Sequence, residues 1–382
     1  MARLKYWVWL SCATGVRPMA KYRLLEAMGG PDKIFFAQRE DIMAAFSVRP
    51  PEADRLMDKS MAKAAKTLSF CEEHGISILT LQDATYPERL RNIPDPPAVL
   101  YVWGKLPAVD ESLTLAVVGT RKATPYGIKM ASLMGREIAQ GGGIVVSGLA
   151  DGCDGAAMEA ALRAGGVTVG VLGTAIDQVY PARNKELFEE VRGRGALVSE
   201  YPPMARTFPQ DFKTRNRIIT GLSLGVVVAE SPLRSGTQNT ANHALEQNRD
   251  VFAVPGNADA AASAGCNALI AQGAVPVSCG ADVLTAYENR LDLSRQEITP
   301  IPIKKEIDKP KDIVYIDLTD QLENLPPVQR QVLTVMTRPD MHADEIIEAA
   351  GLSAQEALAA LTMLQVTGYV AQSTGKRYTR KL

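Results

Sequence analysis

Short apolar runs alternate with helix-length amphipathic segments through the middle of the chain. The apolar runs are rich in valine, and they span residues 113–118, 144–147, 167–172, 196–199, 225–229 and 251–254. Runs of this length and composition are typical of strands that are buried on both faces. The segments between them have helical length, at residues 127–140, 155–164, 184–192, 211–222 and 237–247. The alternation predicts an α/β domain over residues 76–290, with a doubly wound, Rossmann-like parallel sheet.

The first 75 residues have a helical pattern instead. Leu24, Leu25 and Met28 recur at helical spacing, and the following Gly-Gly-Pro ends that helix. Further helical patterns cover residues 43–46 and 53–70. Residues 1–75 are therefore predicted to form a small helical domain of the SAM-like or helix-hairpin-helix kind.

The last part of the chain contains two segments of different composition and pattern. Residues 291–317 are rich in proline and charge, which predicts an extended linker. Residues 318–382 then predict three helices, at 326–336, 342–350 and 353–367, followed by a short hairpin. Ser353 with Glu356 is a capping-box pattern at the start of the third helix. This order favours a winged helix, with another small three-helix domain as the alternative.

Composition bounds the class of protein. Of the 382 residues, 46% are hydrophobic and 22% are charged, which excludes collagen-like and disordered chains. No run reaches the roughly 18 apolar residues of a membrane helix. The apolar start of the chain is broken by Ser11 and Thr14, so a secretion signal is not favoured. The five cysteines form no CxxC pair, which predicts a cytoplasmic protein without a metal site.

The distribution of charge along the chain is more informative about ligands than the net charge. The chain has 42 basic and 43 acidic residues, a formal net charge of −1, which as a total argues against binding nucleic acid. Residues 206–217, however, carry four basic side chains against Asp211, with Phe208 and Phe212 between them. The basic residues are Arg206, Lys213, Arg215 and Arg217. Positive charge with interleaved aromatic rings is typical of single-strand binding, and the alternative is a solvated helix start.

Glycine-containing turns follow three of the predicted strands. They contain Gly119, Thr120, Arg121 and Lys122 after the first strand, Ser147 and Gly148 after the second, and Ser235, Gly236 and Thr237 after the fifth. Backbone N–H groups at such turns bind anions, and Arg121 adds a planar fork of donors for phosphate. A tight turn with a surface arginine is the alternative. The chain has no GxGxxG after the first strand and no Walker motif, so neither dinucleotide binding nor ATP hydrolysis is indicated.

Two carboxylates follow predicted strands. Asp154 is expected to cap the helix after the second strand. Glu230, at the end of the fifth strand, is either a general base or a partner that holds Arg215 or Arg217. We favour the second role for Glu230.

Taken together, these segments resemble the DNA-processing protein A family, also called DprA or Smf. The matching motifs occur in the family's order, at residues 118–127, 146–154, 180–184, 199–202, 215–223 and 244–257, and include Arg215-Asn216-Arg217. The chain departs from the family at Met158, where a member often has His. It departs again at Gln238 and Asn239, which stand within a segment that often reads Ser-Leu-Ile-Thr.

The resemblance implies a homodimer that binds single-stranded DNA through its middle domain. It also implies a partnership with the RecA recombinase in natural transformation, in which the protein protects incoming DNA and loads RecA. It implies no catalysis and no cofactor. By motif, Arg121 is expected to grip phosphate, with Thr120 and Gly148 as further donors. Lys213 and Arg206 would form a basic wall, and Phe212 would stack on a base.

Two other functions remain open on the sequence. The first is a phosphoribohydrolase-like enzyme of the Rossmann type, in which Glu230 would act on a nucleotide held by the turn at residues 235–237. The second is a regulator that reads duplex DNA with its winged helix, whose basic end at residues 376–381 would lie in the wing.

Overall fold

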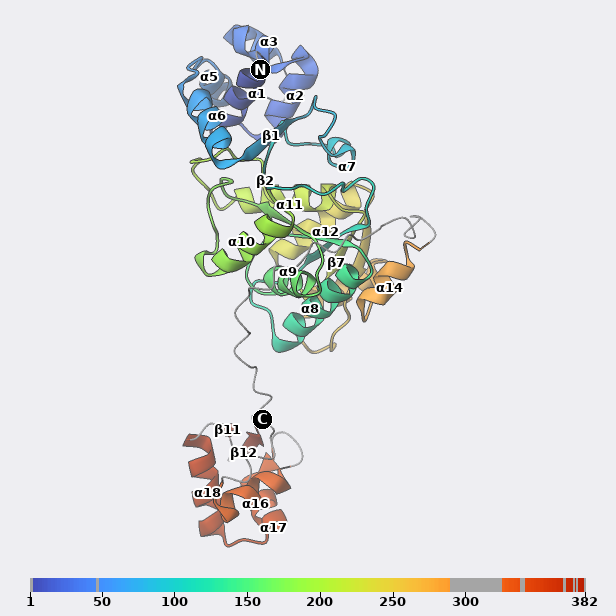
Figure 1. Ribbon diagram of the computed structural model, residues 1–382. Coiled ribbons are helices and arrows are strands. Elements are labelled where there is room, and N and C mark those ends of the chain that lie inside the picture. The colour runs from blue at the N-terminus through green and yellow to red at the C-terminus, as the bar shows by residue number, and fades with distance from the viewer. Residues whose placement is uncertain are drawn as a thin grey trace. The chain divides into compact units, whose positions relative to one another are not determined.

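The computed structural model describes residues 3–45, 48–288, 325–336, 341–366, 369–373, 375 and 377–380. The chain divides into two units, residues 1–300 and residues 301–382 (Figure 1). The linker predicted at 291–317 lies outside the described residues.

Within the described residues, the first unit contains one nine-stranded sheet of order β1-β2-β6-β5-β4-β3-β7-β8-β9. Its strands are β1 Ile76–Thr80, β2 Val99–Gly104, β3 Thr114–Val118, β4 Ile144–Ser147, β5 Thr168–Leu172, β6 Ala196–Ser199, β7 Gly225–Val228, β8 Asp250–Ala253 and β9 Val275–Pro276. All neighbours from β6 to β9 pair in parallel. The six predicted strands and the doubly wound parallel sheet are therefore confirmed.

The sequence pattern missed the edges of this sheet. β1 and β2 pair antiparallel with each other, and β2 pairs antiparallel with β6, so one edge of the sheet is not parallel. β9 has only two residues, too few to show any periodicity. The antiparallel direction of β2 is set by its pairing with β6, about a hundred residues later in the sequence, which no local pattern reveals.

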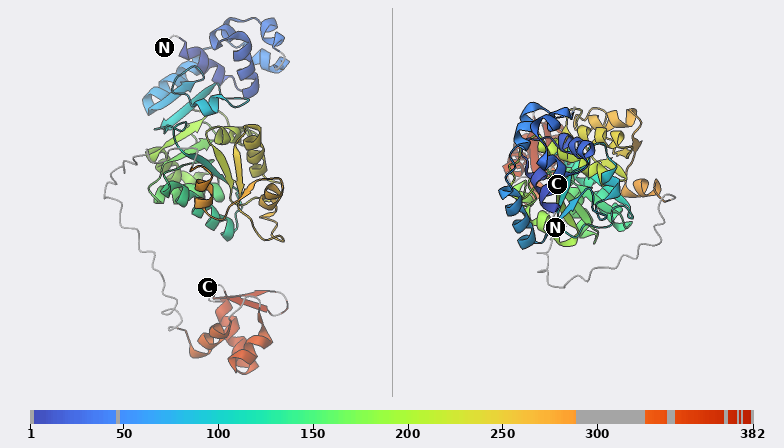
Figure 2. Two further views of the ribbon diagram at one scale, coloured as in Figure 1. Left: turned by 90° about the vertical axis from the view of Figure 1, so that its right-hand side faces the viewer. Right: turned by 90° about the horizontal axis from the view of Figure 1, so that it is seen from above.

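Helices cover both faces of the sheet (Figure 2). They are α7 Glu88–Arg91, α8 Pro125–Gln140, α9 Cys153–Arg163, η1 Ala182–Asn184, α10 Lys185–Arg194, α11 Asp211–Gly221, α12 Gly236–Glu246, α13 Ala264–Ala271 and α14 Gly280–Thr285. Side chains of α8, α9 and α14 share one hydrophobic cluster with alternate residues of the central strands. Side chains of α11, α12 and α13 share a second cluster with the other residues of those strands. Burial on both faces explains why the strands read as continuous apolar runs.

The helices before the first strand form a third cluster with the edge of the sheet. They are α1 Leu4–Cys12, α2 Pro18–Met28, α3 Pro31–Phe36, α4 Arg39–Ala44, α5 Pro50–Leu56 and α6 Ala62–His74. The cluster includes Trp7 and Trp9 of α1 together with Tyr101 of β2 and Leu197 of β6. Ser11 Oγ also lies 2.6 Å from the Tyr101 hydroxyl. The helical region is therefore packed on β2 and β6 rather than isolated from the sheet.

One predicted helix in this region is wrong in extent. The pattern at 53–70 predicts a single helix, but the structure has α5 and α6 with a break between them. In the break, Asp58 accepts the backbone N–H of Ser60, and Ser60 Oγ accepts the backbone N–H of Ala62. Short polar side chains that bind nearby backbone compete with helical hydrogen bonds. The pattern at 43–46 corresponds to the end of α4, and Phe46 lies outside the described residues.

The second unit is a winged helix, as predicted. Its helices are α16 Pro327–Val335, α17 Ala343–Ala350 and α18 Ala354–Val366. Its described strands, β10 Met341–His342, β11 Val370–Ser373 and β12 Arg377–Arg380, form a sheet of order β10-β12-β11. The capping box is confirmed, because the backbone N–H of Glu356 donates to Ser353 Oγ and that of Ser353 donates to Glu356. Among the residues that the structure describes, no helix is long and apolar enough to cross a membrane.

Candidate nucleic-acid interface

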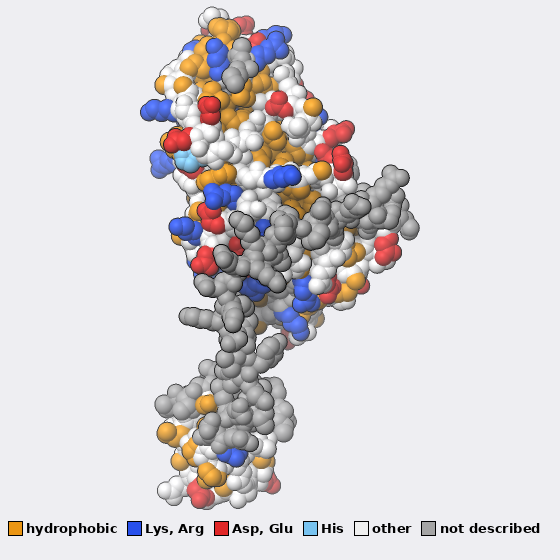
Figure 3. All heavy atoms as spheres, in the orientation of Figure 1, with side chains coloured by type: hydrophobic (Ala, Val, Ile, Leu, Met, Phe, Trp, Pro, Cys, Tyr) orange, Lys and Arg blue, Asp and Glu red, His pale blue; other side chains and the backbone are white. Residues whose placement is uncertain are grey.

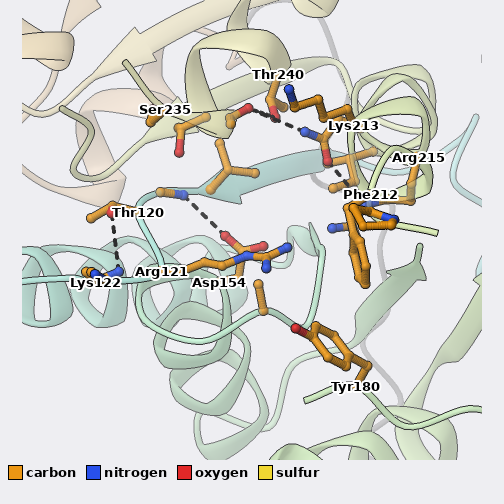
Figure 4. A pocket seen from close by; sticks show the side chains of 18 of the residues that line it. Thr120, Arg121, Lys122, Asp154, Tyr180, Phe212, Lys213, Arg215, Ser235 and Thr240 are labelled. Carbon is orange, nitrogen blue, oxygen red and sulfur yellow. Dashed lines mark hydrogen bonds between the residues drawn. The ribbon is translucent and has the colours of Figure 1, made fainter. Parts of the chain in front are cut away.

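A cleft of about 1170 Å³ opens beside the carboxyl ends of β3 and β7 (Figure 4). The sheet order places β4, β5 and β6 on one side of β3, and β7 and β8 on its other side. β3 and β7 therefore flank the point where the winding of the sheet reverses. Open α/β sheets bind their ligands at such a switch point. Three segments meet there, namely the turn after β3, residues 207–219 and the start of α12.

The turn after β3 is held by hydrogen bonds within the protein. The backbone N–H of Gly119 donates to Asp154 at 3.2 Å, and that of Thr120 donates to the Glu230 carbonyl at 2.8 Å. The backbone N–H of Lys122 donates to Thr120 Oγ1 at 3.3 Å. The prediction that these N–H groups bind an anion is therefore wrong, because protein acceptors already use them. The side chains of Arg121 and Lys122, both exposed, are what this turn offers to a ligand.

Asp154 joins the ends of β3 and β4. It lies in the first turn of α9, only 6% exposed, and its carboxylate accepts the backbone N–H groups of Gly119 and Gly148 at 3.2 and 3.1 Å. The predicted capping role is wrong, since Gly152 is the N-cap residue of α9. Burial raises the pKa of Asp154, and Arg215 with the two N–H groups opposes that rise.

The second predicted turn does not present donors to the cleft. The Gly148 N–H is taken by Asp154, and the Ser147 hydroxyl, which is fully buried, donates to the Val117 carbonyl at 2.6 Å. The expectation that Ser147 and Gly148 donate to DNA is therefore wrong in this structure. Their role is to fix the end of β4 against β3.

Arg215 lies in the floor of the cleft and is only 4% exposed. Its guanidinium donates to the carbonyl of Gly148 at 3.0 Å and to the carbonyl of Val171. Burial lowers the pKa of Arg215 to about 10, while the nearby Asp154 opposes that change. Arg215 thus connects α11 to the ends of β4 and β5 and places positive charge beneath the cleft.

Arg217 is directed away from the cleft, and the expectation that it contacts DNA is wrong. It is 1% exposed, and its guanidinium donates to Asp95 and to both carboxylate oxygens of Glu200 at 2.9 Å. Asp95 and Glu200 neutralise the charge of Arg217, and its burial keeps it from a phosphate in the solvent.

Glu230 does not hold either arginine, so our favoured role for it is also wrong. Its carboxylate accepts the backbone N–H of Thr124 at 2.8 Å and the Thr124 hydroxyl at 2.6 Å. Glu230 lines another cavity, of about 380 Å³, and does not line the cleft.

A cluster of aromatic and cationic side chains lines the cleft. The ring of Phe212 has the Arg121 guanidinium carbon 5.1 Å from its centroid and the ring of Tyr180 at a centroid distance of 5.0 Å (Figure 4). Tyr180 is 50% exposed, so much of its ring is accessible. Lys213, beside Phe212 on α11, is exposed at the rim. Gly173 leaves room for this arrangement, since a Cβ there would lie 2.7 Å from Phe212 Cδ1.

The start of α12 forms the facing wall. Ser235 is the N-cap residue, yet its side chain does not cap the helix; its hydroxyl lies 2.8 Å from that of Ser231. The first N–H groups of α12 therefore receive no side-chain acceptor from Ser235, as expected of an anion-ready turn. Asn216 connects the two walls by donating to the Gly236 carbonyl at 3.4 Å.

Eleven of the fifteen predicted contact residues line the cleft. They are Gly119, Thr120, Arg121, Lys122, Phe212, Lys213, Arg215, Asn216, Ser235, Gly236 and Thr237. The structure does not bring Ser147, Gly148, Arg206 or Arg217 to it. Among the lining residues that the sequence reasoning did not select as contacts are Thr174, Gln178, Tyr180, Pro209 and Thr240. Tyr180 could have been predicted from the sequence, because it lies in the motif at residues 180–184 that supports the resemblance.

The two departures from the family pattern do not line the cleft. Met158 is fully buried in the hydrophobic core of the first unit. Gln238 donates to Ser231 Oγ at 3.1 Å and supports the loop before α12. Among the described residues, no three or more His, Cys, Asp or Glu side chains are grouped to hold a metal ion.

Fold and site together define a Rossmann-type α/β protein with a basic, aromatic cleft at its switch point, joined to a winged helix. The family model of DNA recombination-mediator protein A matches residues 77–288, and that of the DprA winged helix domain matches residues 317–376. The chain therefore belongs to the DNA-processing protein A (DprA/Smf) family, as its motifs indicated.

Related proteins are similar to this chain over much of its length. The Smf protein of Synechocystis is 32% identical over 410 aligned positions, which cover 98% of each chain. The X-ray structure of DNA processing protein A from Streptococcus pneumoniae matches with a TM-score of 0.65 at 34% identity, over 74% of this chain and 97% of that one. A Helicobacter pylori DNA processing protein A structure, described for its single-stranded DNA binding mode, matches with a TM-score of 0.51 at 28% identity, over 56% of this chain and 96% of that one.

Proposed function

We propose that the protein binds single-stranded DNA in the cleft at the switch point, with Arg121 and Lys213 on phosphates and Phe212 stacked on a base. The observation that carries this proposal is the cluster of Arg121, Phe212 and Tyr180 beside an exposed lysine. Aromatic faces accept any base, and flanking positive charge follows the backbone. The related H. pylori protein, described as binding single-stranded DNA, supports the same ligand.

The electrostatic balance of the cleft supports an anionic polymer as the ligand. Arg121, Lys122, Lys213 and Arg215 line it, and the one carboxylate among its lining residues is Asp154, which accepts two backbone N–H groups. Neutralising phosphates releases counterions, so affinity falls as salt rises.

Family membership supports a proposed biological role. The protein would act as a homodimer in natural transformation, protect incoming single-stranded DNA and load the RecA recombinase on it. All five cysteines are free thiols, which suits a reducing cytoplasm.

A binding role is favoured over the phosphoribohydrolase alternative. The Glu230 carboxylate is engaged by Thr124 and does not line the cleft, so it lies apart from the residues proposed to hold phosphate. If Glu230→Gln abolished release of free base from a nucleoside monophosphate, the enzymatic function would replace our proposal.

The test is fluorescence anisotropy with a labelled oligo-dT and its duplex over a series of salt concentrations. We expect Phe212→Leu to weaken single-strand binding by about 1–3 kcal/mol and to leave the salt dependence unchanged, because it removes an aromatic face but no charge. We expect Arg121→Ala to weaken binding and to reduce the slope of log K against log salt by about 0.7, the value for one single-strand phosphate.

The matched control is Lys129→Ala, which removes an exposed charge from α8, outside the cleft. It is expected to bind like the unsubstituted protein. Unchanged binding in both Arg121→Ala and Phe212→Leu would show that the cleft is not the DNA site. Tighter binding of the duplex than of the single strand would favour the winged-helix alternative.

A further inference from the structure

A second cavity, of about 430 Å³, lies where the N-terminal helices meet the segment that follows β6. Its volume is within the range of small-ligand pockets. Residues 11–21, which join α1 to α2, form one side, and residues 200–214 form the other. The cations that line it are Arg17, Lys21, Arg55 and Arg206.

Most of this positive charge is not neutralised within the protein. Of the four cations, Arg17 pairs with Glu52 at 2.8 Å. In the part of the chain that the structure describes, no carboxylate forms an ion pair with Lys21, Arg55 or Arg206.

The two acids that line the cavity are already engaged. Glu200 is bound to Arg217, and Asp211 accepts the backbone N–H of Phe208 at 2.7 Å. Four basic side chains against two acidic ones leave an excess of positive charge among the lining residues, which attracts an anion.

Two of the cations are held by hydrogen bonds to backbone carbonyls. Lys21 Nζ donates to the Ser11 carbonyl at 2.9 Å, which uses one of its three protons. Arg55 donates to the Thr14 carbonyl at 3.0 Å, and its guanidinium lies across Gly15, in the space that a Cβ would fill. Burial lowers the pKa of Lys21, and a bound anion would favour its charged form.

The second cavity adjoins the cleft along one segment. Thr207, Pro209 and Lys213 line the cleft, whereas Arg206, Gln210 and Thr214 line the second cavity. Phe208 lines both, so its ring stands where the two meet. The Arg206 guanidinium carbon lies 5.3 Å from the centroid of that ring. This pair repeats, at the boundary, the arginine and phenylalanine pairing of Arg121 and Phe212 in the cleft.

We propose that the DNA strand continues from the cleft, over Phe208, into this second cavity, where Lys21, Arg55 and Arg206 bind at least one further phosphate. The inference rests on the proposed function, because it extends the same strand. It assigns part of the DNA contact to the N-terminal helical region and accounts for the position of Arg206, which lies outside the cleft.

The test is the dependence of affinity on oligonucleotide length, measured by anisotropy with the full chain and a series of oligo-dT from roughly 4 to 16 nucleotides, the range of single-strand sites. The variant is Arg55→Gln, and the control is Lys66→Gln, an exposed lysine of α6 that does not line the cavity. We expect the variant to bind the shortest oligonucleotides as the unsubstituted protein does. The unsubstituted protein is expected to bind longer oligonucleotides more tightly than short ones, and the variant should not show this increase. For long oligonucleotides, the slope of log K against log salt should be smaller in the variant by about 0.7.

Arg55→Lys keeps the charge and is expected to restore binding of long oligonucleotides, which separates loss of charge from loss of fold. The inference is overturned if Arg55→Gln matches the unsubstituted protein at every length, or if it weakens all lengths by the same factor. Failure of the unsubstituted protein to bind any length would overturn the proposed function instead.

Discussion

At the scale of single residues, the buried ion pairs of Arg217 on α11 stabilise the fold around the cleft. Arg217 is 1% exposed, and its partners Glu200 and Asp95 come from the segments after β6 and before β2. Removing one member of a buried pair leaves the remaining charges in a medium that solvates them poorly.

We therefore expect Arg217→Met to lower the free energy of unfolding by about 3 kcal/mol. The matched control is Arg183→Met, which breaks the pair with Asp151 where the Arg183 side chain is 70% exposed. Exposed pairs contribute about 0–1 kcal/mol, so the control should be nearly as stable as the unsubstituted protein. Urea denaturation followed by circular dichroism measures both. Equal losses in the two variants would contradict the structural role of Arg217.

The sequence could not show that Arg217 lies away from the cleft while Arg215 lines it. Both arginines belong to the same basic stretch and to the same motif, so neither charge nor the resemblance separates them. What separates them is the position of Asp95 and Glu200, which are distant in sequence and meet Arg217 only in the fold. Phe212 and Lys213 were identified because aromatic and basic residues interleave in residues 206–217, and Arg121 because it follows a strand in a glycine-containing turn.

At the scale of elements, the turn after β3 depends on the start of α9. Gly152 has φ +77°, and a Cβ there would lie 2.3 Å from the Thr120 carbonyl oxygen and 2.8 Å from that of Arg121. Those oxygens are backbone atoms, so the turn itself would have to shift. The position of Arg121 is therefore set by a glycine that does not line the cleft.

We expect Gly152→Ala to weaken single-strand binding about as much as Arg121→Ala, although it changes no charge. The control is Gly165→Ala, with a similar φ of +83° but no atom within 4 Å of the added Cβ. Both substitutions place a side chain at a positive φ, which residues other than glycine rarely adopt, and only the first also meets backbone atoms of the turn. Anisotropy titrations compare the two, and an equal effect on binding would contradict this account.

The start of α5 provides a pH-dependent contribution to stability. Burial alone would raise the pKa of Glu52, but hydrogen bonds from the Arg17 side chain and from the backbone of Arg17 and Arg49 outweigh it and lower the pKa to about 2. Because the folded pKa lies below the ordinary value of 4.5, this stability is present above pH 4.5 and is lost as the pH falls toward 2.

Glu52→Gln is accordingly expected to lower stability at neutral pH and to flatten the loss of stability between pH 4.5 and about 2. Urea denaturation at a series of pH values measures the slope. An unchanged slope in that window would show that the Glu52 and Arg17 pair does not contribute.

The sequence predicted the central elements well because each is buried on both faces and reads as one apolar run. It predicted the periphery less well. The antiparallel edge and the two-residue strands β9 and β10 depend on pairing with distant residues. The break between α5 and α6 depends on side chains that bind local backbone.

At the scale of the whole molecule, the described residues form two units with separate cores. The clusters that include β1 to β8 contain only residues of the first unit, and the cluster of the winged helix contains only residues of the second. On the face of the first unit shown in Figure 3, basic and acidic side chains are interspersed, in line with the net charge of −1. Local excess charge in the cavities thus coexists with a balanced surface.

Removing residues 318–382 is expected to leave single-strand affinity unchanged, since the cleft lies in a unit with its own cores. Duplex binding, if the winged helix supplies it, would be lost. Anisotropy with both DNA forms separates the two outcomes. Loss of single-strand binding in a truncated protein that still unfolds cooperatively would contradict the assignment of the cleft.

The two buried arginines of α11 also bear on the rate at which DNA binds. Arg215 ties α11 to β4 and β5, and Arg217 ties it to the segments around β2 and β6. A helix held on two sides does not have to rearrange before a strand enters. Stopped-flow association is therefore expected to stay linear in DNA concentration and to accelerate as salt is lowered, because diffusion and long-range attraction limit it. An association rate that reaches a plateau at high DNA concentration would show that α11 or its surroundings must open before DNA binds, which would contradict this account.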